Sequence, residues 1–258
     1  MNSGMYSALS GNVSAMKRLD IIASNLANAA TTGFKQDRLA FESVLAGSQN
    51  PPAVPTGQTA DPVLLQERLL TDYSSGALVQ TGNTLDVALQ GEGFFVVRTP
   101  DGVAFTRQGN FRLSNDGTLV TANGYPVLSK AGDQPADGQP IKIDVTAQAT
   151  GGKPVVDAEG NITLNGEAVA SLAIFDFPKP YQLTKTAGTL FVAGNGVVPR
   201  PVGPLTTVSQ GALEQSNVNS IGEMVQMVET SRYFETCQRA VRSFDDMTSK
   251  AINELGRV

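Results

Sequence analysis

Histidine and tryptophan are absent from the 258 residues, and Cys237 is the single cysteine. Without histidine, the chain lacks the side chain that most often serves as a general base and as a transition-metal ligand. One cysteine excludes an intramolecular disulfide. The net charge is −5 and no basic cluster is visible. A cluster of lysines and arginines is needed to neutralise nucleic-acid phosphates, so we predict no nucleic-acid partner.

Long hydrophobic runs are also missing. The longest, such as GFFVV at 93–97, are far too short to cross a bilayer, so we predict no membrane insertion. Residues 1–16 lack the basic start and apolar run of a cleaved signal peptide. We expect either a cytoplasmic protein or export by a route that does not read such a signal. Hydrophobic residues make up 41% of the chain, which is typical of a globular protein.

The first 35 residues predict an α-helix, because apolar side chains recur at steps of three or four over 5–30. Gly33 follows where a left-handed residue commonly ends a helix. The apolar stripe consists of Met5, Leu9, Val13, Met16, Leu19, Ile22 and Leu26.

A second helix is predicted within 213–258, over residues 218–256, and would be about 58 Å long against about 39 Å for the first. Its opposite face is charged. The apolar positions that we assign to an interface are Ile221, Met224, Val228, Phe234, Val241, Phe244 and Leu255.

The middle of the chain has a different pattern. Residues 36–68 include the proline-rich stretch GSQNPPAVPTG at 47–57 and are interpreted as a linker or extended arm. Residues 69–212 alternate apolar and polar positions and predict a mainly antiparallel, all-β domain. Its strands are separated by six turn pairs: Asp101-Gly102, Asp116-Gly117, Asn123-Gly124, Asp137-Gly138, Asn165-Gly166 and Asn195-Gly196.

The fold class is therefore α+β, with a β domain inserted between two terminal helices. An isolated amphipathic helix cannot bury its own stripe, so we expect the two helices to pair in the manner of a coiled coil. The longer second helix would overhang the first by about 20 Å and carry Phe234, Val241 or Phe244 into a contact with other copies. The alternative is that both helices fold back on the β domain and complete a monomeric core.

Candidate chemistry is scarce. GEGFFV at 91–96 starts like a dinucleotide fingerprint, but Val96 stands where the third glycine belongs. Cys237 lies on an apolar helical stripe with no histidine to activate it. The stretch SNDGTL at 114–119 lacks the acidic spacing of a calcium loop. We predict no catalytic residue, no metal site, no cofactor and no small-molecule substrate.

Four separated segments resemble the bacterial flagellar basal-body rod protein family. They are NLANAATTGFK at 25–35, QTGNTLDVALQGEGFFVV at 80–97, FTRQGNFRLSNDGTLVTANGYPVL at 105–128 and GALEQSNVNSIGEMVQMVETSRYFE at 211–235. Within that family the start of the chain and LAIFDFPKPYQL at 172–183 look most like the proximal-rod type, with the distal-rod type as the alternative.

The resemblance implies a structural subunit that polymerises into the shaft crossing the periplasm and transmits torque from motor to hook. It implies other rod subunits as partners and export by the flagellar type III apparatus without a cleaved signal peptide. It also implies paired terminal helices inside the shaft and β domains outside. The first segment contributes the N-terminal family motif, which comprises Asn25, Leu26, Asn28, Thr32, Gly33 and Phe34.

Within this motif, Asn25 and Asn28 are three apart and are predicted to hydrogen-bond across a helix interface. Thr31, Thr32 and Gly33 would end the helix, and Phe34 would anchor the strand that follows. Two other classes stay open: a β-domain binding module displayed on a coiled-coil stalk, and an enzyme built on paired carboxylates. No paired acids converge in the sequence, which disfavours the enzyme.

Overall fold

The computed structural model describes residues 2–45, 63–132, 134–143, 152–194, 196–203 and 205–255. The proline-rich stretch 47–57 and Asn195 lie outside the described residues. The chain divides into two compact units. The helical unit comprises residues 1–27, 36–73 and 219–258, and the β unit comprises residues 28–35 and 74–218. Among the described residues, no helix is long and apolar enough to cross a membrane.

Helix α1 spans Asn2–Ala27 and helix α3 spans Ser220–Leu255, so an N-terminal and a C-terminal helix flank the strands as expected. Helix α1 stops before Thr31, earlier than the sequence suggests, and residues 28–33 form turns instead. Asn219 begins α3 as its N-cap, because its side-chain Oδ1 accepts the backbone N–H of Gly222 at 3.2 Å.

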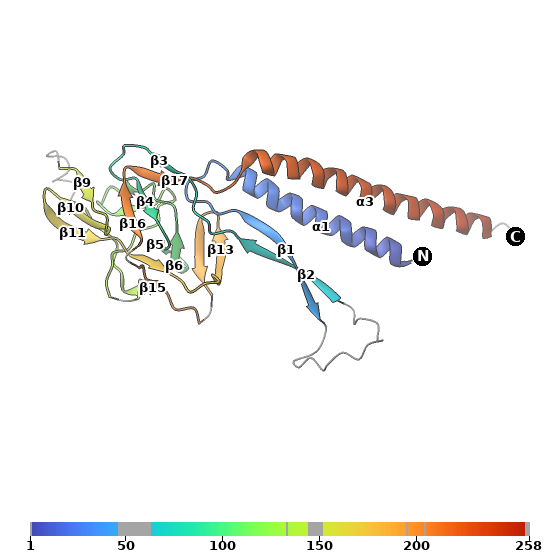
Figure 1. Cartoon of the computed structure of the whole chain (residues 1–258), viewed down its shortest axis with the longest axis horizontal. Coiled ribbons are helices and arrows are strands. Elements are labelled where there is room, and N and C mark those ends of the chain that lie inside the picture. The colour runs from blue at the N-terminus through green and yellow to red at the C-terminus, as the bar shows by residue number, and fades with distance from the viewer. Residues whose placement is uncertain are drawn as a thin grey trace. The chain divides into compact units, whose positions relative to one another are not determined.

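In the helical unit, α1 and α3 lie side by side and run in opposite directions (Figure 1). Gly11 permits the close approach, because a Cβ at this position would lie 3.0 Å from the Tyr233 Oη and 3.3 Å from the Cys237 Sγ. The glycine that weakens the helical pattern is therefore explained by packing.

The same contact fixes the level of the two helices. Gly11 is level with Tyr233, and Asn25 is level with Glu223. The first turn of α1 is consequently level with residues near 244 of α3. Phe234 and Val241 lie alongside α1 rather than beyond it, so the overhang starts later than the sequence estimate. It covers the last ten or so residues of α3, about 15 Å.

The helical unit also contains a two-stranded antiparallel ladder within the segment interpreted as a linker. Strand β1 (Asp37–Leu45) pairs with β2 (Val63–Thr71), from Asp37 opposite Thr71 to Leu45 opposite Val63. The expected boundary at residue 69 thus falls inside a strand, and residues up to Tyr73 group with the helices. Unbroken alternation is lacking in VLLQERLLT, which explains why the strand is hard to see from sequence.

All paired strands of the β unit are antiparallel. Six of them form one sheet in the order β13-β14-β6-β5-β12-β15, and β11-β10-β9 form a second. The strands are β3 (Leu78–Gln80), β4 (Val87–Gln90), β5 (Phe94–Thr99), β6 (Gly102–Thr106), β7 (Arg112–Leu113), β8 (Leu119–Val120), β9 (Pro154–Val156), β10 (Asn161–Leu164), β11 (Glu167–Ser171), β12 (Ile174–Asp176), β13 (Leu183–Ala187), β14 (Leu190–Ala193), β15 (Arg200–Pro201), β16 (Thr207–Gln210) and β17 (Ala212–Glu214).

Strand β5 lies at the centre of the six-stranded sheet and is buried on both faces from Phe94 to Val97. The ring of Phe94 packs against Phe191 at 5.7 Å between centroids, and the ring of Phe95 packs against Phe111 at 5.2 Å. These contacts lie on opposite faces, because successive side chains of a strand alternate. The uninterrupted apolar run at 93–97 therefore marks a strand that is covered on both sides.

The turn pairs mostly behave as their chemistry predicts. Asn165 and Gly166 both have positive φ, 54° and 88°, as a two-residue hairpin turn between β10 and β11 requires. Asp137-Gly138 is the exception, because Gly138 has φ −61° and follows a short 3-10 helix, Pro135–Asp137. Pro135 favours that helical turn over a hairpin.

Gly109 offers a test of the packing in the β unit. A Cβ at this position would lie 1.6 Å from the Val87 carbonyl oxygen, which is fixed in the β4–β16 ladder. We expect Gly109→Ala to lower the free energy of unfolding by about 3 kcal/mol, measured by urea denaturation. Gly203→Ala is the control, because no atom lies within 4 Å of its added Cβ. Equal stability of the two variants would contradict this packing.

Candidate functional site

The N-terminal family motif continues past the end of α1 into a tight turn of the β unit. The backbone N–H of Gly33 donates to the carbonyl of Glu214 at 2.8 Å. Gly33 has φ 69°, and a Cβ would lie 2.4 Å from the Gln108 nitrogen. Glycine is therefore required here for its conformation and for the close approach of two backbones.

The next two residues are buried in the β unit. Phe34 is 1% exposed, and the Lys185 Nζ lies 3.8 Å from the centroid of its ring, in a cation–π contact. The Lys185 Nζ also donates to the Lys35 carbonyl at 2.8 Å. Phe34 is thus held on one side by a charge that strand β13 supplies.

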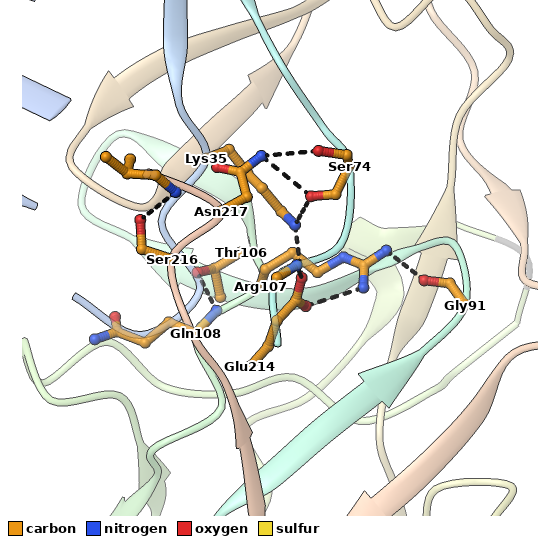
Figure 2. Close-up of polar contacts among 11 residues, drawn as sticks. Lys35, Ser74, Gly91, Thr106, Arg107, Gln108, Glu214, Ser216 and Asn217 are labelled. Atoms are coloured by element: carbon orange, nitrogen blue, oxygen red, sulfur yellow. Dashed lines mark hydrogen bonds and ion pairs between the residues drawn. The ribbon is translucent and has the colours of Figure 1, made fainter. Parts of the chain in front are cut away.

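A buried ion triad follows from Lys35 (Figure 2). The Glu214 carboxylate binds the Lys35 Nζ through Oε1 at 2.6 Å and the Arg107 Nη1 through Oε2 at 3.2 Å. Two backbone carbonyls also bind the cations: Ser74 accepts from the Lys35 Nζ at 2.7 Å, and Gly91 accepts from the Arg107 Nη2 at 2.7 Å. The charged side chains are 1–4% exposed.

The triad holds two positive charges and one negative charge in the core. The excess charge is stabilised by the carbonyl dipoles and by the face of Phe94, whose centroid lies 5.4 Å from the Arg107 guanidinium carbon. The Gly76 N–H donates to the Glu214 Oε1 at 3.0 Å. Removing one member would leave uncompensated charge in the core, so the triad is stable only when all its members are present.

Three distant chain segments meet at this triad. Asn217 adds to it, because its Nδ2 donates to the Ser74 carbonyl at 3.2 Å and to the Ser74 Oγ at 3.1 Å (Figure 2). Residues 35, 74 and 217 are all next to, or one residue from, the places where the chain passes from one unit to the other. The triad and Asn217 therefore hold three of the four ends of the β unit beside one another.

The helical unit has a polar cluster of its own around Asn25. The Asn25 Nδ2 donates to the Asp37 carbonyl at 2.8 Å, and the Asp37 N–H donates back to the Asn25 Oδ1 at 3.0 Å. The Asn25 Nδ2 also lies 3.3 Å from the Glu223 Oε2, and the Gln36 Nε2 donates to the Glu223 Oε1 at 2.9 Å. This cluster joins α1, the start of β1 and the first turn of α3.

Glu223 is well placed in this cluster. It is 3% exposed and lies in the first turn of α3, where the helix dipole favours a negative charge. Nearby, burial raises the pKa of Tyr73 to about 12; its hydrogen bond with Thr71 opposes the shift and the charge of Asp37 adds to it. The phenol of Tyr73 therefore stays protonated at neutral pH.

The motif residues do not all share one role. Asn25 bonds across to α3, and Leu26 is half-buried. Asn28 lies beyond the end of α1, where its Oδ1 accepts the Thr31 hydroxyl at 3.3 Å and its carbonyl accepts the Thr31 N–H at 3.0 Å. The Thr32 hydroxyl lies 3.5 Å from the Asn110 Oδ1. The two asparagines therefore act in different units.

The apolar positions assigned to a helix interface differ widely in burial. Ile22 is buried, and Leu19 and Leu26 are half-buried. Phe234, Val241 and Phe244 of α3 are also half-buried, and the side chain of Leu255 lies outside the described residues. The remaining positions are exposed: Met5, Leu9, Val13, Met16, Ile221, Met224 and Val228.

The sequence did not predict four charged members of the two clusters, Lys35, Arg107, Glu214 and Glu223, nor the neutral amide of Gln36. Glu214 and Arg107 each stand in a β-like stretch beside buried apolar residues, which is the one local signal of a buried charge. The residues that bond to one another through their side chains in these clusters are 107 to 198 positions apart, so no local spacing connects them. Among the described residues, no group of three His, Cys, Asp or Glu side chains is placed to hold a metal ion.

Glu214→Gln tests the triad. The amide has a similar shape but leaves Lys35 and Arg107 buried without a counter-charge, so we expect a loss of about 3–5 kcal/mol in the free energy of unfolding. Urea denaturation of the full chain measures it. The control is Glu92→Gln, which breaks the exposed Lys179–Glu92 ion pair and is expected to cost at most about 1 kcal/mol. Similar losses of unfolding free energy in both variants would show that the buried triad contributes no more to stability than an exposed ion pair.

Asn25→Asp tests the second cluster. The substitution removes the Nδ2 donor and places a carboxylate beside Glu223, so we expect the pairing of α1 with α3 to weaken by about 1–3 kcal/mol. Faster amide hydrogen exchange in α1 and α3 is the readout. Asn28→Asp, beyond the helix end, is the matched control. Unchanged exchange in Asn25→Asp would contradict the role of this cluster.

Known protein families match this chain in sequence. Three family descriptions match in chain order: Flagella basal body rod protein over residues 5–35, Flagellar hook protein FlgE/F/G D1 domain over 88–164, and Flagellar basal body rod FlgEFG protein C-terminal over 209–254. The first match ends at Lys35 and the third includes Glu214 and Glu223. Both polar clusters thus draw residues from the terminal matched regions.

Relatives match over nearly the whole length. The flagellar basal-body rod protein FlgF of Rhizobium meliloti is 36% identical, with 99% of both chains covered. FlgF of Mesorhizobium japonicum is 32% identical over 99% of both chains. FlgG of Bacillus subtilis is 32% identical over 98% of this chain and 99% of its own. The resemblance in the four sequence segments is confirmed, and this chain belongs to the flagellar basal-body rod protein family.

Proposed function

We propose that the chain is a structural subunit of the flagellar basal-body rod, of the proximal-rod type, which polymerises into the shaft that crosses the periplasm. The observation that carries the proposal is the end-to-end correspondence with FlgF relatives at 36% and 32% identity. In this role the subunit passes torque from the motor to the hook through contacts between copies and related subunits.

The helical unit supplies the assembling part in this proposal. Helices α1 and α3 pack closely at Gly11, and we propose that they form a coiled-coil-like pair in the shaft. The interface residues are those assigned from sequence, from Met5 to Leu26 on α1 and from Ile221 to Leu255 on α3. The exposure of several of them in a single chain supports contacts with neighbours, because exposed apolar patches commonly mark interaction sites.

The β unit is proposed to form the outer part of the shaft. Its ion triad and two-sided core stabilise it without any need for the helices to contribute to its core. The subunit is proposed to work without catalysis and without a cofactor. Its partners are other rod subunits and the flagellar type III export apparatus, and export proceeds without a cleaved signal peptide.

Two other functions predict different behaviour. A distal-rod or hook-type axial protein is favoured by the 32% identity to FlgG of Bacillus subtilis, and it would assemble at another place in the same shaft. A β-domain binding module on a coiled-coil stalk would form a discrete dimer or trimer whose size does not change with concentration.

Complementation tests the proposal. In a strain that lacks its own copy of this gene, we expect the full chain to restore swimming and a rod visible in isolated basal bodies by electron microscopy. A chain without residues 2–20 should restore neither, because α3 loses its partner helix.

A substitution in the β unit provides the control for that experiment. Leu205→Ser changes a side chain that is 91% exposed and should swim like the original chain. Circular dichroism of the truncated chain must still show a folded β unit. Full motility of the truncated chain would refute the rod proposal, and a discrete oligomer in solution would favour the binding module.

A further inference from the structure

Helix α1 carries an exposed apolar stripe along its N-terminal half. Met5, Leu9, Val13 and Met16 follow one another at steps of three or four, and each is 41–54% exposed. The buried residues of the same helix, Ala15 among them, lie on another side. These four residues are called the α1 stripe below.

Helix α3 carries a second stripe near its start. Ile221, Met224, Val225 and Val228 are 49–73% exposed and also share one helical face. Glu223 lies between them in sequence but is buried and bonds to Asn25 of α1. These four residues, the α3 stripe, therefore point away from α1.

The two stripes cannot meet within one chain, because they lie at different levels of the antiparallel pair. Gly11 is level with Tyr233, so the α1 stripe lies alongside residues near 230–241 of α3. Asn25 is level with Glu223, so the α3 stripe lies alongside residues near 18–25 of α1. The stripe centres are about eleven residues apart, or about 16 Å along the helix axis.

We infer that the α3 stripe of a second copy of this chain docks on the α1 stripe, with the two copies displaced by about 16 Å along the helix axis. The inference rests on the proposed function and specifies the contact between copies. The α1 stripe covers about three helical turns and the α3 stripe about two, so the whole α3 stripe can lie on the α1 stripe. A displacement equal to their offset brings them to the same level.

The charges agree with this pairing. Residues 2–16 of α1 contain no charged side chain, and residues 220–231 of α3 contain acidic side chains only, Glu223 and Glu229. Docking therefore brings no like charges together and desolvates no charge of the α1 stripe.

The pairing is heterologous, because it joins two different surfaces. Each copy still offers its α1 stripe to one neighbour and its α3 stripe to another. Such a contact repeats without closing into a dimer. Successive copies would then add with the same axial step.

Disulfide trapping between copies tests the pairing, in a Cys237→Ser background. Full-length chains with Val13→Cys are mixed with full-length chains with Val225→Cys and oxidised. We expect the mixed disulfide on the order of tenfold or more above the control, because docking raises the local thiol concentration. The control mixes Val13→Cys with Met247→Cys, whose native side chain is 51% exposed, as Val225 is 54%, but lies outside both stripes.

A chain that carries both Val13→Cys and Val225→Cys should give a ladder of multimers. The pairing would be overturned if most disulfides joined two Val13→Cys chains, or if the Met247→Cys control gave the same yield of mixed disulfide as Val225→Cys. Sedimenting assemblies without the mixed disulfide would overturn it while leaving the rod proposal standing. A chain that stays monomeric and gives no excess of the mixed disulfide also overturns it, and the rod proposal is then judged by complementation alone.

Discussion

The carboxylate of Glu214 is the interaction on which the β unit depends. It pairs with two buried cations from separate segments of the unit, Lys35 beside a crossing to the helical unit and Arg107 after strand β6. Removing any one member leaves uncompensated charge in a site that water does not reach. An apolar cluster of the same volume would stabilise the fold as well, but it would tolerate shifted positions. The Gly76 N–H donates to the ion triad and the Ser74 carbonyl accepts from it, so the triad is compatible with one arrangement of the three chain segments.

The helical unit also joins its segments through a buried carboxylate, that of Glu223, but its partners there are the neutral amide side chains of Asn25 and Gln36. Asn25 satisfies both backbone polar groups of Asp37 and still reaches Glu223, and Gln36 binds the other carboxylate oxygen. Amide side chains specify position through their paired donor and acceptor geometry. Each unit thus holds its own crossing segments by polar side chains and backbone groups: Lys35, Ser74 and Asn217 in the β unit, and Gln36 and Glu223 in the helical unit.

The sequence predicted the elements better than the contacts. Helix periodicity predicted both helices within a few residues. Predicted turn pairs connect the hairpins β5–β6, β7–β8 and β10–β11, whereas at Asp137-Gly138 Pro135 favours a 3-10 turn. The ladder of β1 and β2 was not predicted, because the sequence of β2 does not alternate regularly between apolar and polar residues. The triad of Lys35, Arg107 and Glu214 was not predicted, because a buried charge is recognised only by its partners. Arg107 and Glu214, for example, are more than a hundred positions apart in the sequence. The docking level of α1 and α3 depends on Gly11, whose role appears only when Tyr233 lies against it.

The bond between Asn217 and Ser74 has a consequence for how this architecture can diversify. It joins the two ends of the segment 74–218, so this segment enters and leaves the β unit at neighbouring points. An insertion with adjoining ends can lengthen, shorten or be exchanged with little effect on the segments that flank it. Selection can therefore change the β unit of such a subunit while the residues that set the register of the two helices stay unchanged.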